Sequence, residues 1–327
     1  MRKKNPAIEL VRGICSVLVV FIHCPFPGVA GQYITGFSRM AVPFFLLVSG
    51  YFACRGDAIS YAWKKIVETL RLAGVLTLVY GAVNTLRSIV LTGSVIGWIL
   101  PYCNWTSVLE LLLLNRANFI SWIMWYLISL VYVYGIYAVA SKTRTMKLLY
   151  GLTPLLLMAN LVVSEYLGMP WYYAGNFLLT SLPFFCVGHF LRYVKLEERK
   201  CPTWLPPVGV IVGMVLTAAE IHRDPRAYCY VGTIIAAVCV FIWCVQGADK
   251  KLPKTIARFS SDYSVLIFAL HCAVKDLLEL LPVDFSAGAI KWGKPLIVLG
   301  ITILVSGLLR WVGGRWAALR ANKSDAI

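Results

Sequence analysis

The chain has 327 residues, of which 59% are hydrophobic and 14% are charged, and its mean hydropathy is +0.74. These values exclude an ordinary soluble domain and indicate a membrane protein with several spans. On a soluble protein the formal net charge of +16 would suggest nucleic acid. No basic stripe or recognition motif supports such a partner, and we expect most of this charge in cytoplasmic loops.

Apolar runs long enough to cross a lipid bilayer occur about ten times along the chain. We therefore expect an all-α, polytopic membrane protein with both termini in the cytoplasm. A single membrane domain would cover 1–327, with no soluble domain appended. The expected spans are 8–24, 38–54, 70–92, 119–140, 147–164, 174–193, 205–220, 228–247, 262–282 and 295–314. The stretch 94–118 is amphipathic and is expected at the membrane interface.

The N-terminal MRKK and the apolar stretch behind it resemble a signal peptide, but Glu9 and Arg12 interrupt the stretch. We expect it to be retained as the first helix. With the N-terminus inside, most lysines and arginines outside the spans would be cytoplasmic, as the positive-inside rule requires. The stretches expected outside carry only Arg116, Arg223, Arg226, Lys291 and Lys294.

The chain has 10 cysteines, most of them inside apolar runs. None forms a CxxC pair or a Cys/His spacing typical of zinc sites, so we expect no metal.

The ionisable side chains of Arg12 and His23 lie in the first apolar run, one near its start and the other near its end. Eleven residues of helix rise about 16 Å and make close to three turns, so both side chains would face the same way at different depths. A histidine at membrane depth suggests function, and its ordinary pKa suits proton transfer near neutrality. The alternatives stay open: Arg12 as a membrane-interface anchor paired with Glu9, and His23 as a buried structural residue.

The stretch RMAVPFFLLVSGYF, residues 39–52, places an arginine before a Pro-Phe-Phe step and a Ser49-Gly50 pair. Small residues let helices approach closely, or let a ligand reach the backbone. The pattern does not decide between packing and substrate contact.

These stretches carry a shared pattern: Arg, ten residues and His in the first span, then Arg-x-x-small-Pro-Phe-Phe and Ser-Gly-aromatic-Phe in the second. WYLISLVYVY at 125–134, PFFCVGHFLR at 183–192 and SSDYSVLIFALH at 260–271 continue it in order. Together they resemble the acyltransferase 3 family of integral membrane O-acyltransferases over essentially the whole chain. Two features depart from the family: Glu9 stands where Asp is usual, and WKKIVETLRL replaces an Arg-x-x-Arg pattern, keeping basic residues but not their spacing.

The resemblance implies a multi-pass plasma-membrane transferase. It would move an acyl group, most often acetyl, from cytoplasmic acyl-CoA to a hydroxyl of a carbohydrate or lipid-linked glycan outside. His23 would be the general base, and the other catalytic candidates are Arg12, Arg39 and Ser49. The candidates for binding the CoA phosphates are Arg12, Lys64, Lys65, Arg71 and Arg192. Possible helpers are Glu9, Trp125 and His271.

A histidine base usually has an orienting partner. Glu9 lies 14 residues from His23, about 21 Å along the helix, and is too far away. Asp262, Asp276 and Glu279 remain candidates, whereas Cys24 points about 100° away from His23 around the helix.

Two other function classes stay open. The first is a polytopic transporter or flippase, although no inverted halves are visible. The second is a membrane module that supplies substrate without acyl transfer.

Overall fold

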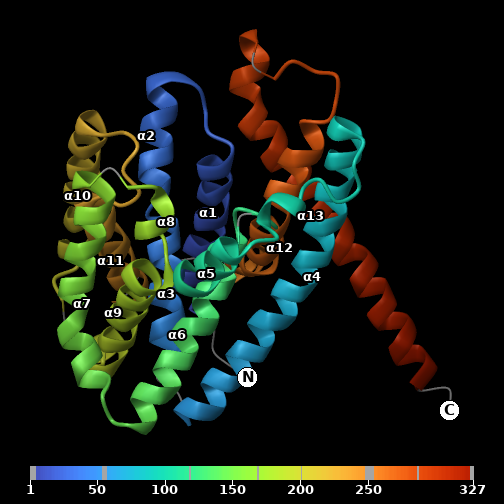
Figure 1. Ribbon diagram of the computed structural model, residues 1–327. Coiled ribbons are helices and arrows are strands. Elements are labelled where there is room, and N and C mark those ends of the chain that lie inside the picture. Colours follow the sequence, from blue (N-terminus) through green and yellow to red (C-terminus); the bar gives the residue numbers. More distant parts are fainter. Residues whose placement is uncertain are drawn as a thin grey trace.

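The computed structural model describes residues 5–53, 57–117, 119–167, 169–199, 201–246, 254–285 and 287–324, except the side chains of 254–259, 261 and 314–324. Within these residues every regular element is a helix, which confirms the all-α prediction (Figure 1). The α-helices are α1 (Pro6–His23), α2 (Gly28–Ser38), α3 (Ala41–Ala53), α4 (Ala58–Thr92), α5 (Trp105–Leu114), α6 (Met124–Lys142), α7 (Met146–Leu161), α8 (Trp171–Ala174), α9 (Leu182–Tyr193), α10 (Leu205–Arg223), α11 (Val231–Gln246), α12 (Lys254–Leu278) and α13 (Gly288–Ser324).

Among the described residues, 7 helical stretches are long and apolar enough to cross a membrane. They are Pro6–His23, Gly28–Ala53, Ala58–Thr92, Met124–Lys142, Met146–Tyr166, Leu205–Arg223 and Gly288–Gly313. Two shorter apolar stretches, Phe177–Tyr193 and Val231–Gln246, coincide with two further expected spans. The protein is therefore a multi-pass integral membrane protein. The total of about ten spans and the cytoplasmic placement of both termini stay predictions.

The second span differs from its prediction. It was expected at 38–54, but the helical stretch already begins at Gly28 and continues to Ala53, with a turn at Arg39 and Met40 that separates α2 from α3. The polar residues Gln32, Thr35 and Ser38 lower the hydropathy of α2 and hid it from a search for apolar runs. The turn matters because it carries Arg39.

Helix α1 ends where the sequence predicts. Asn5 caps its first turn by accepting from the backbone N–H groups of Ala7 and Ile8. At the other end, His23 is the last helical residue, and Pro25 and Pro27 follow in the link to α2. Proline has no backbone N–H and cannot continue a helix, so the break falls directly after His23. In Figure 1, α1 ends at the upper side of the bundle.

Helices α3 and α9 cross in very close contact, and glycine makes it possible. A Cβ added at Gly50 would lie 1.9 Å from the carbonyl oxygen of Phe185, and one added at Gly188 would lie 2.1 Å from that of Leu47. The packing interpretation of the Ser49-Gly50 pair is therefore confirmed for Gly50.

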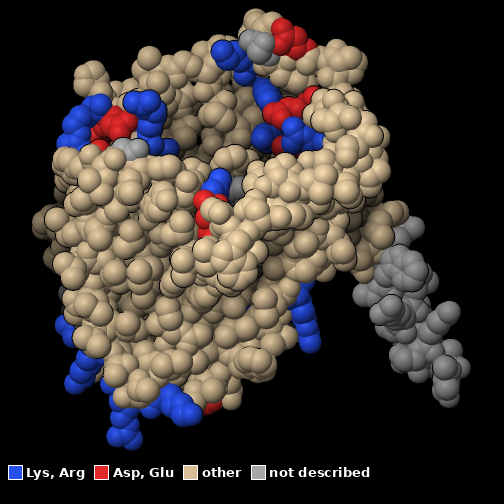
Figure 2. Space-filling view, viewed as in Figure 1, with Lys and Arg blue, Asp and Glu red and all other residues tan. Residues whose placement is uncertain are grey.

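Charge is unevenly distributed over the surface (Figure 2). The upper side carries basic and acidic groups next to one another. The lower side shows mostly basic side chains. This is the distribution that the positive-inside rule predicts for a lower side facing the cytoplasm, an orientation that stays a prediction.

Candidate functional site

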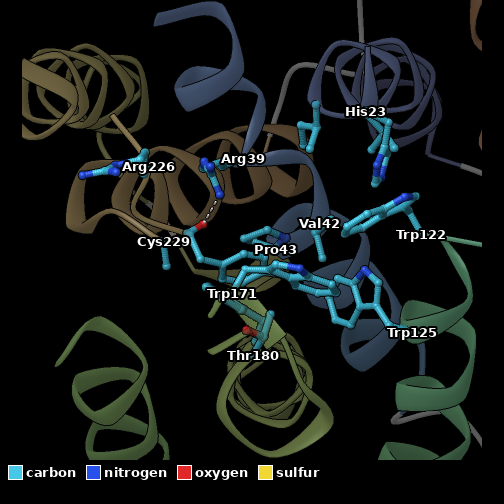
Figure 3. Close-up of a pocket in the computed structure, with 14 residues that line it drawn as sticks. His23, Arg39, Val42, Pro43, Trp122, Trp125, Trp171, Thr180, Arg226 and Cys229 are labelled. Carbon is cyan, nitrogen blue, oxygen red and sulfur yellow. Dashed lines mark hydrogen bonds between the residues drawn. The ribbon is translucent and has the colours of Figure 1, made fainter. Parts of the chain in front are cut away.

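A cavity of about 330 Å³ opens near the upper end of α1, and we call it the His23 cavity (Figure 3). It unites three of the predicted site residues, His23, Arg39 and Trp125, which come from α1, the turn before α3, and α6. Its remaining lining is largely aromatic and aliphatic. The lining residues are Val19, Ile22, His23, Arg39, Val42, Pro43, Trp122, Trp125, Trp171, Thr180, Phe184, Arg226, Tyr228 and Cys229.

His23 faces a second histidine. Its ring centroid lies 5.2 Å from that of His271 on α12, one of the predicted helpers. His271 is 1% exposed, and its Nδ1 lies 2.9 Å from the carbonyl oxygen of Ile267. A carbonyl only accepts, so Nδ1 carries the proton and Nε2 is the unprotonated nitrogen of the neutral ring. Nε2 is buried without a hydrogen-bond partner. The structure thus brings an open acceptor close to His23.

The three carboxylates proposed as partners of His23 all have cationic neighbours. Asp262 accepts from Arg310 at 2.7 Å. Asp276 lies 3.2 Å from Arg87 and 3.2 Å from Lys275, and Glu279 accepts from Lys294 at 2.8 Å. Among the groups considered, His271 is the one whose ring lies against that of His23.

The same place offers ligands for a metal ion. Donor atoms of His23, His271 and Cys272 all lie within 4.8 Å of one another. The sequence search for close Cys/His spacing missed this cluster because it combines α1 with α12. A metal-bound histidine commonly donates its second N–H to a carbonyl, as His271 does to Ile267. The expectation of no metal stays a prediction.

Arg39 enters the His23 cavity from the α2–α3 turn. Its Nη1 donates to the carbonyl oxygen of Tyr228 at 3.0 Å, the dashed line in Figure 3. The guanidinium carbon also lies 5.9 Å from the ring centroids of both Tyr228 and Tyr230, within reach of a cation–π interaction. Its Nε is buried without a partner. A buried donor without a partner is uncommon and calls for an explanation.

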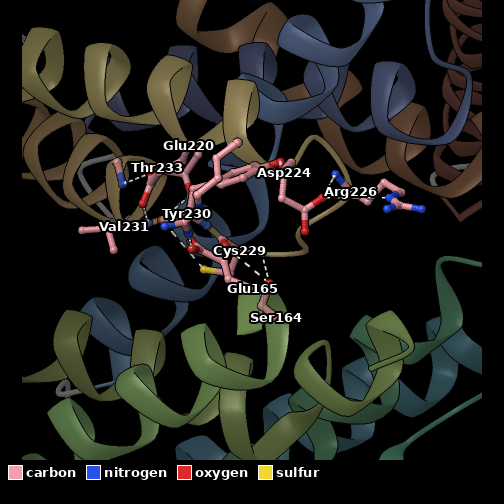
Figure 4. A network of polar contacts seen from close by, with 11 residues as sticks. Ser164, Glu165, Glu220, Asp224, Arg226, Cys229, Tyr230, Val231 and Thr233 are labelled. Carbon is pink, nitrogen blue, oxygen red and sulfur yellow. Dashed lines mark hydrogen bonds and ion pairs between the residues drawn. The ribbon is translucent and has the colours of Figure 1, made fainter. Parts of the chain in front are cut away.

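The loop that supports Arg39 is held rigidly between α10 and α11 (Figure 4). Glu220 accepts from the first backbone N–H groups of α11, at 3.0 Å from Val231 and 2.9 Å from Gly232. The backbone N–H of Cys229 donates to Ser164 at 2.8 Å, and the Tyr230 hydroxyl donates to the Asp224 carbonyl at 2.9 Å. Tyr228 and Arg226 therefore line the cavity from a fixed wall. The sequence singled out neither residue as part of the site, although the stretch Tyr228-Cys229-Tyr230 at the start of the expected span 228–247 was an available signal.

A second cavity, of about 300 Å³, lies toward the start of α1, and we call it the Arg12 cavity. It contains three other predicted residues, Arg12, Ser49 and Lys65, and its remaining lining residues are Phe45, Glu68, Thr69, Leu72, Tyr126, Leu127, Leu130, Tyr134, Ser264, Val265 and Phe268. Arg12 lies 3.2 Å from Glu9, so the predicted pair is present. Lys65 lies 2.6 Å from Glu68, and Ser49 donates to the Phe45 carbonyl of its own helix at 2.9 Å.

The other three predicted phosphate ligands do not line either cavity in the described part of the chain. Lys64 and Arg71 are exposed on α4. Arg192 pairs with Glu197 and also donates to Tyr51. Partial burial disfavours ionisation of Glu197, but hydrogen bonds from its own backbone and from Tyr51, with the charge of Arg192, bring the pKa of its carboxyl below the ordinary value.

Aromatic rings lie between the two cavities. Tyr126 of the Arg12 cavity has its ring centroid 6.4 Å from that of Phe45 and 5.5 Å from that of Phe268. The ring centroid of Phe268 in turn lies 6.5 Å from that of His271. On the other side, the ring centroid of Trp125 lies 6.2 Å from that of Tyr126, and Trp125 lines the His23 cavity. These rings form an aromatic wall between the two cavities.

These features define a class of protein: a multi-pass helical membrane protein with two cavities at opposite ends of one helix and a histidine pair between helices. Residues 5–311 match the acyltransferase 3 family, described as an acyltransferase domain. The chain therefore belongs to the acyltransferase 3 family of membrane acyltransferases. No curated protein and no solved structure matches it.

Proposed function

We propose that this protein is a plasma-membrane O-acyltransferase. It takes an acyl group, acetyl in the first place, from cytoplasmic acyl-CoA and transfers it to a hydroxyl of a carbohydrate or lipid-linked glycan on the outer side. His23 is the general base. The acyltransferase family supports the reaction type, and the donor, acceptor and base are our assignments.

One observation carries the proposal: α1 delivers Arg12 to one cavity and His23 to the other. The two residues are about 16 Å apart along the helix axis. A donor whose anionic nucleotide stays near Arg12 and whose narrow arm extends along α1 would present its thioester near His23. An acceptor entering the upper cavity would meet it there.

The chemistry needs a proton acceptor, an acid and a donor to the oxyanion. His23 takes the proton of the acceptor hydroxyl while the oxygen attacks the thioester carbonyl. When the tetrahedral intermediate collapses, the C–S bond breaks and protonated His23 returns the proton to the leaving CoA sulfur. His271 orients His23 through its unprotonated Nε2, the part that a carboxylate plays in other triads.

Arg39 is the better candidate for the oxyanion donor. Arg39 and Ser49 are both among the catalytic candidates from the sequence, but Arg39 shares a cavity with His23. Ser49 lies in the Arg12 cavity and donates to its own helix. The unpartnered Nε of Arg39 is a donor that needs no reorganisation before the reaction.

Arg12 and Lys65 are the residues we assign to the CoA phosphates. Each already contacts a carboxylate, Glu9 and Glu68 respectively, so phosphate would share or displace these partners. The exposed Lys64 and Arg71 would act only at longer range.

The test uses purified protein in liposomes with acetyl-CoA labelled on the acetyl group. We would follow free CoA and labelled lipid-linked glycan for the wild type, His23→Ala and His222→Ala. His222 is an exposed histidine at the end of α10 and serves as a matched control. We expect turnover in the wild type and His222→Ala, and its loss in His23→Ala at equal protein levels. Turnover that survives His23→Ala would exclude His23 as the base. Solute movement without CoA release would favour the transporter alternative.

A further inference from the structure

A third cavity, of about 300 Å³, lies beside the His23 cavity on the upper side, and we call it the Arg87 cavity. It lies between the end of α4, the end of α12 and the two loops on either side of α5. Aromatic side chains dominate one part of its lining: Trp98, Tyr102, Phe119 and Trp122. The loop 94–104, predicted to be interfacial, supplies the first two.

The charged side chains of this lining balance one another. Arg87 lies 3.2 Å from Asp276 and 3.6 Å from Glu279, and Lys275 lies 3.2 Å from Asp276. Each of these charged side chains therefore already has an ion-pair partner, and Lys294, outside the lining, also donates to Glu279 at 2.8 Å. No charge of the lining is left unpaired to select an anion or a cation.

Two polar atoms in this cavity lack partners. Ser121 is 5% exposed, yet its hydroxyl makes no hydrogen bond of good geometry, although Tyr80 and Cys272 lie near it, and the buried Nε of Arg87 makes none either. A buried polar group without a partner is costly and calls for an explanation. A ligand rich in hydroxyl groups would satisfy both, because each hydroxyl donates and accepts.

The Arg87 cavity also adjoins the proposed reaction centre. Trp122 lines both cavities. Lys275 follows His271 by one turn of α12 and therefore lies on the same helix face. A ligand with two linked rings could place one ring in each cavity, with Trp122 between them.

We propose that the Arg87 cavity is a second acceptor subsite, which binds an uncharged sugar ring next to the one that is acylated. The aromatic side chains pack against the apolar face of the ring, and the paired charges with Ser121 bond its hydroxyls. This inference rests on the proposed function for its position in the reaction, but not for its binding test. It implies an acceptor of at least two sugar units, with a neutral unit in this cavity.

The test measures saccharide binding without acyl-CoA, with the full-length protein in lipid nanodiscs. The probes are a neutral disaccharide of N-acetylglucosamine, the corresponding monosaccharide, and a disaccharide in which one unit is a uronic acid. The variants are Ser121→Ala and Tyr102→Ala. Tyr173→Ala is the matched control, because Tyr173 is 37% exposed against 39% for Tyr102, and each has an aromatic neighbour.

We expect the neutral disaccharide to bind most tightly, and each cavity variant to weaken it about fivefold, as the loss of one hydrogen bond or ring contact predicts. Ser121→Ala should keep or raise the melting temperature, since it removes an unsatisfied buried hydroxyl. Weaker binding with unchanged stability would not arise from a merely structural serine.

The proposal is overturned if no saccharide binds, if the uronate binds best, or if the cavity variants bind like Tyr173→Ala. The liposome assay with His23→Ala is read separately. Binding that depends on Ser121 without any CoA release would leave this subsite standing and remove the proposed function. CoA release without Ser121-dependent binding would leave the proposed function standing and remove this subsite.

Discussion

Replacing Gly50 by alanine should force α3 and α9 apart. The added Cβ would lie 1.9 Å from the carbonyl oxygen of Phe185 and 3.0 Å from the backbone nitrogen of His189. Both obstacles are backbone atoms, so no side chain can rotate away. Because ordinary contact begins at 3.4 Å, the helices must separate by about 1.5 Å at this point.

The magnitude follows from two opposing effects. Alanine is favoured over glycine inside a helix by about 1 kcal/mol. Overpacking a close contact typically costs about 1–3 kcal/mol, and a backbone clash belongs at the upper end. We therefore expect Gly50→Ala to lower the free energy of unfolding by about 2 kcal/mol. Gly135→Ala is the control, since nothing lies within 4 Å of the added Cβ on α6, and it should stabilise by about 1 kcal/mol.

The assay is thermal unfolding of purified variants in detergent, together with acyl-CoA turnover. Helix α3 carries Ser49 and Phe45 of the Arg12 cavity, and α9 carries Phe184 of the His23 cavity. Separation of the helices should therefore lower turnover even in the folded fraction. The reasoning is refuted if Gly50→Ala melts at or above the temperature of Gly135→Ala.

Four further predictions concern the site. His271→Ala should lower kcat about 10²-fold, the lower end of the range for base catalysis. The pH profile of kcat should shift, and the KM for acyl-CoA should not change. An unchanged pH profile would make His271 structural. Chelators should leave turnover intact, because the His23 nitrogen that takes the proton must be free of metal. A loss of activity that zinc restores would instead identify His23, His271 and Cys272 as metal ligands. Arg12→Ala should raise the KM for acyl-CoA about tenfold and leave the acceptor KM alone, since a charged hydrogen bond to phosphate is lost; equal effects on both would argue for an anchor. Tyr126→Ala should raise kcat/KM for hexanoyl-CoA relative to acetyl-CoA by opening the aromatic wall, and a constant ratio would contradict that wall.

The fold was predictable to the extent that apolar runs define it. Hydropathy found the spans built from continuous apolar residues, such as α1, α6 and α13. It placed the second span ten residues late, because α2 contains polar residues, among them the buried Ser38 and the half-buried Thr35. Burial inside a bundle permits such residues, and composition alone cannot tell protein from lipid as the neighbour.

The sequence predicted many residues that line the two cavities, but not which of them lie together. His23, Arg39 and Trp125 share one cavity and Arg12, Ser49 and Lys65 another, although a sequence pattern selected all of them. What the pattern could not assign is the division into two cavities. That division depends on where helices distant in sequence meet, as α1 meets α12 and α3 meets α9. For the same reason His271 was predicted only as a possible helper, and the expected orienting partners of His23 were carboxylates.

An arginine and a histidine in one apolar helix make physical sense only in this arrangement. Each would be costly in lipid, yet each has a compensating environment: Glu9 beside Arg12, and the unprotonated nitrogen of His271 near His23. A structural pair of charges needs no open space around it, whereas both of these residues line cavities. Open space next to an expensive polar group favours a ligand over packing. Because the aromatic wall lies between the two, whatever joins them must be narrow, and an extended arm with a charged end meets that requirement.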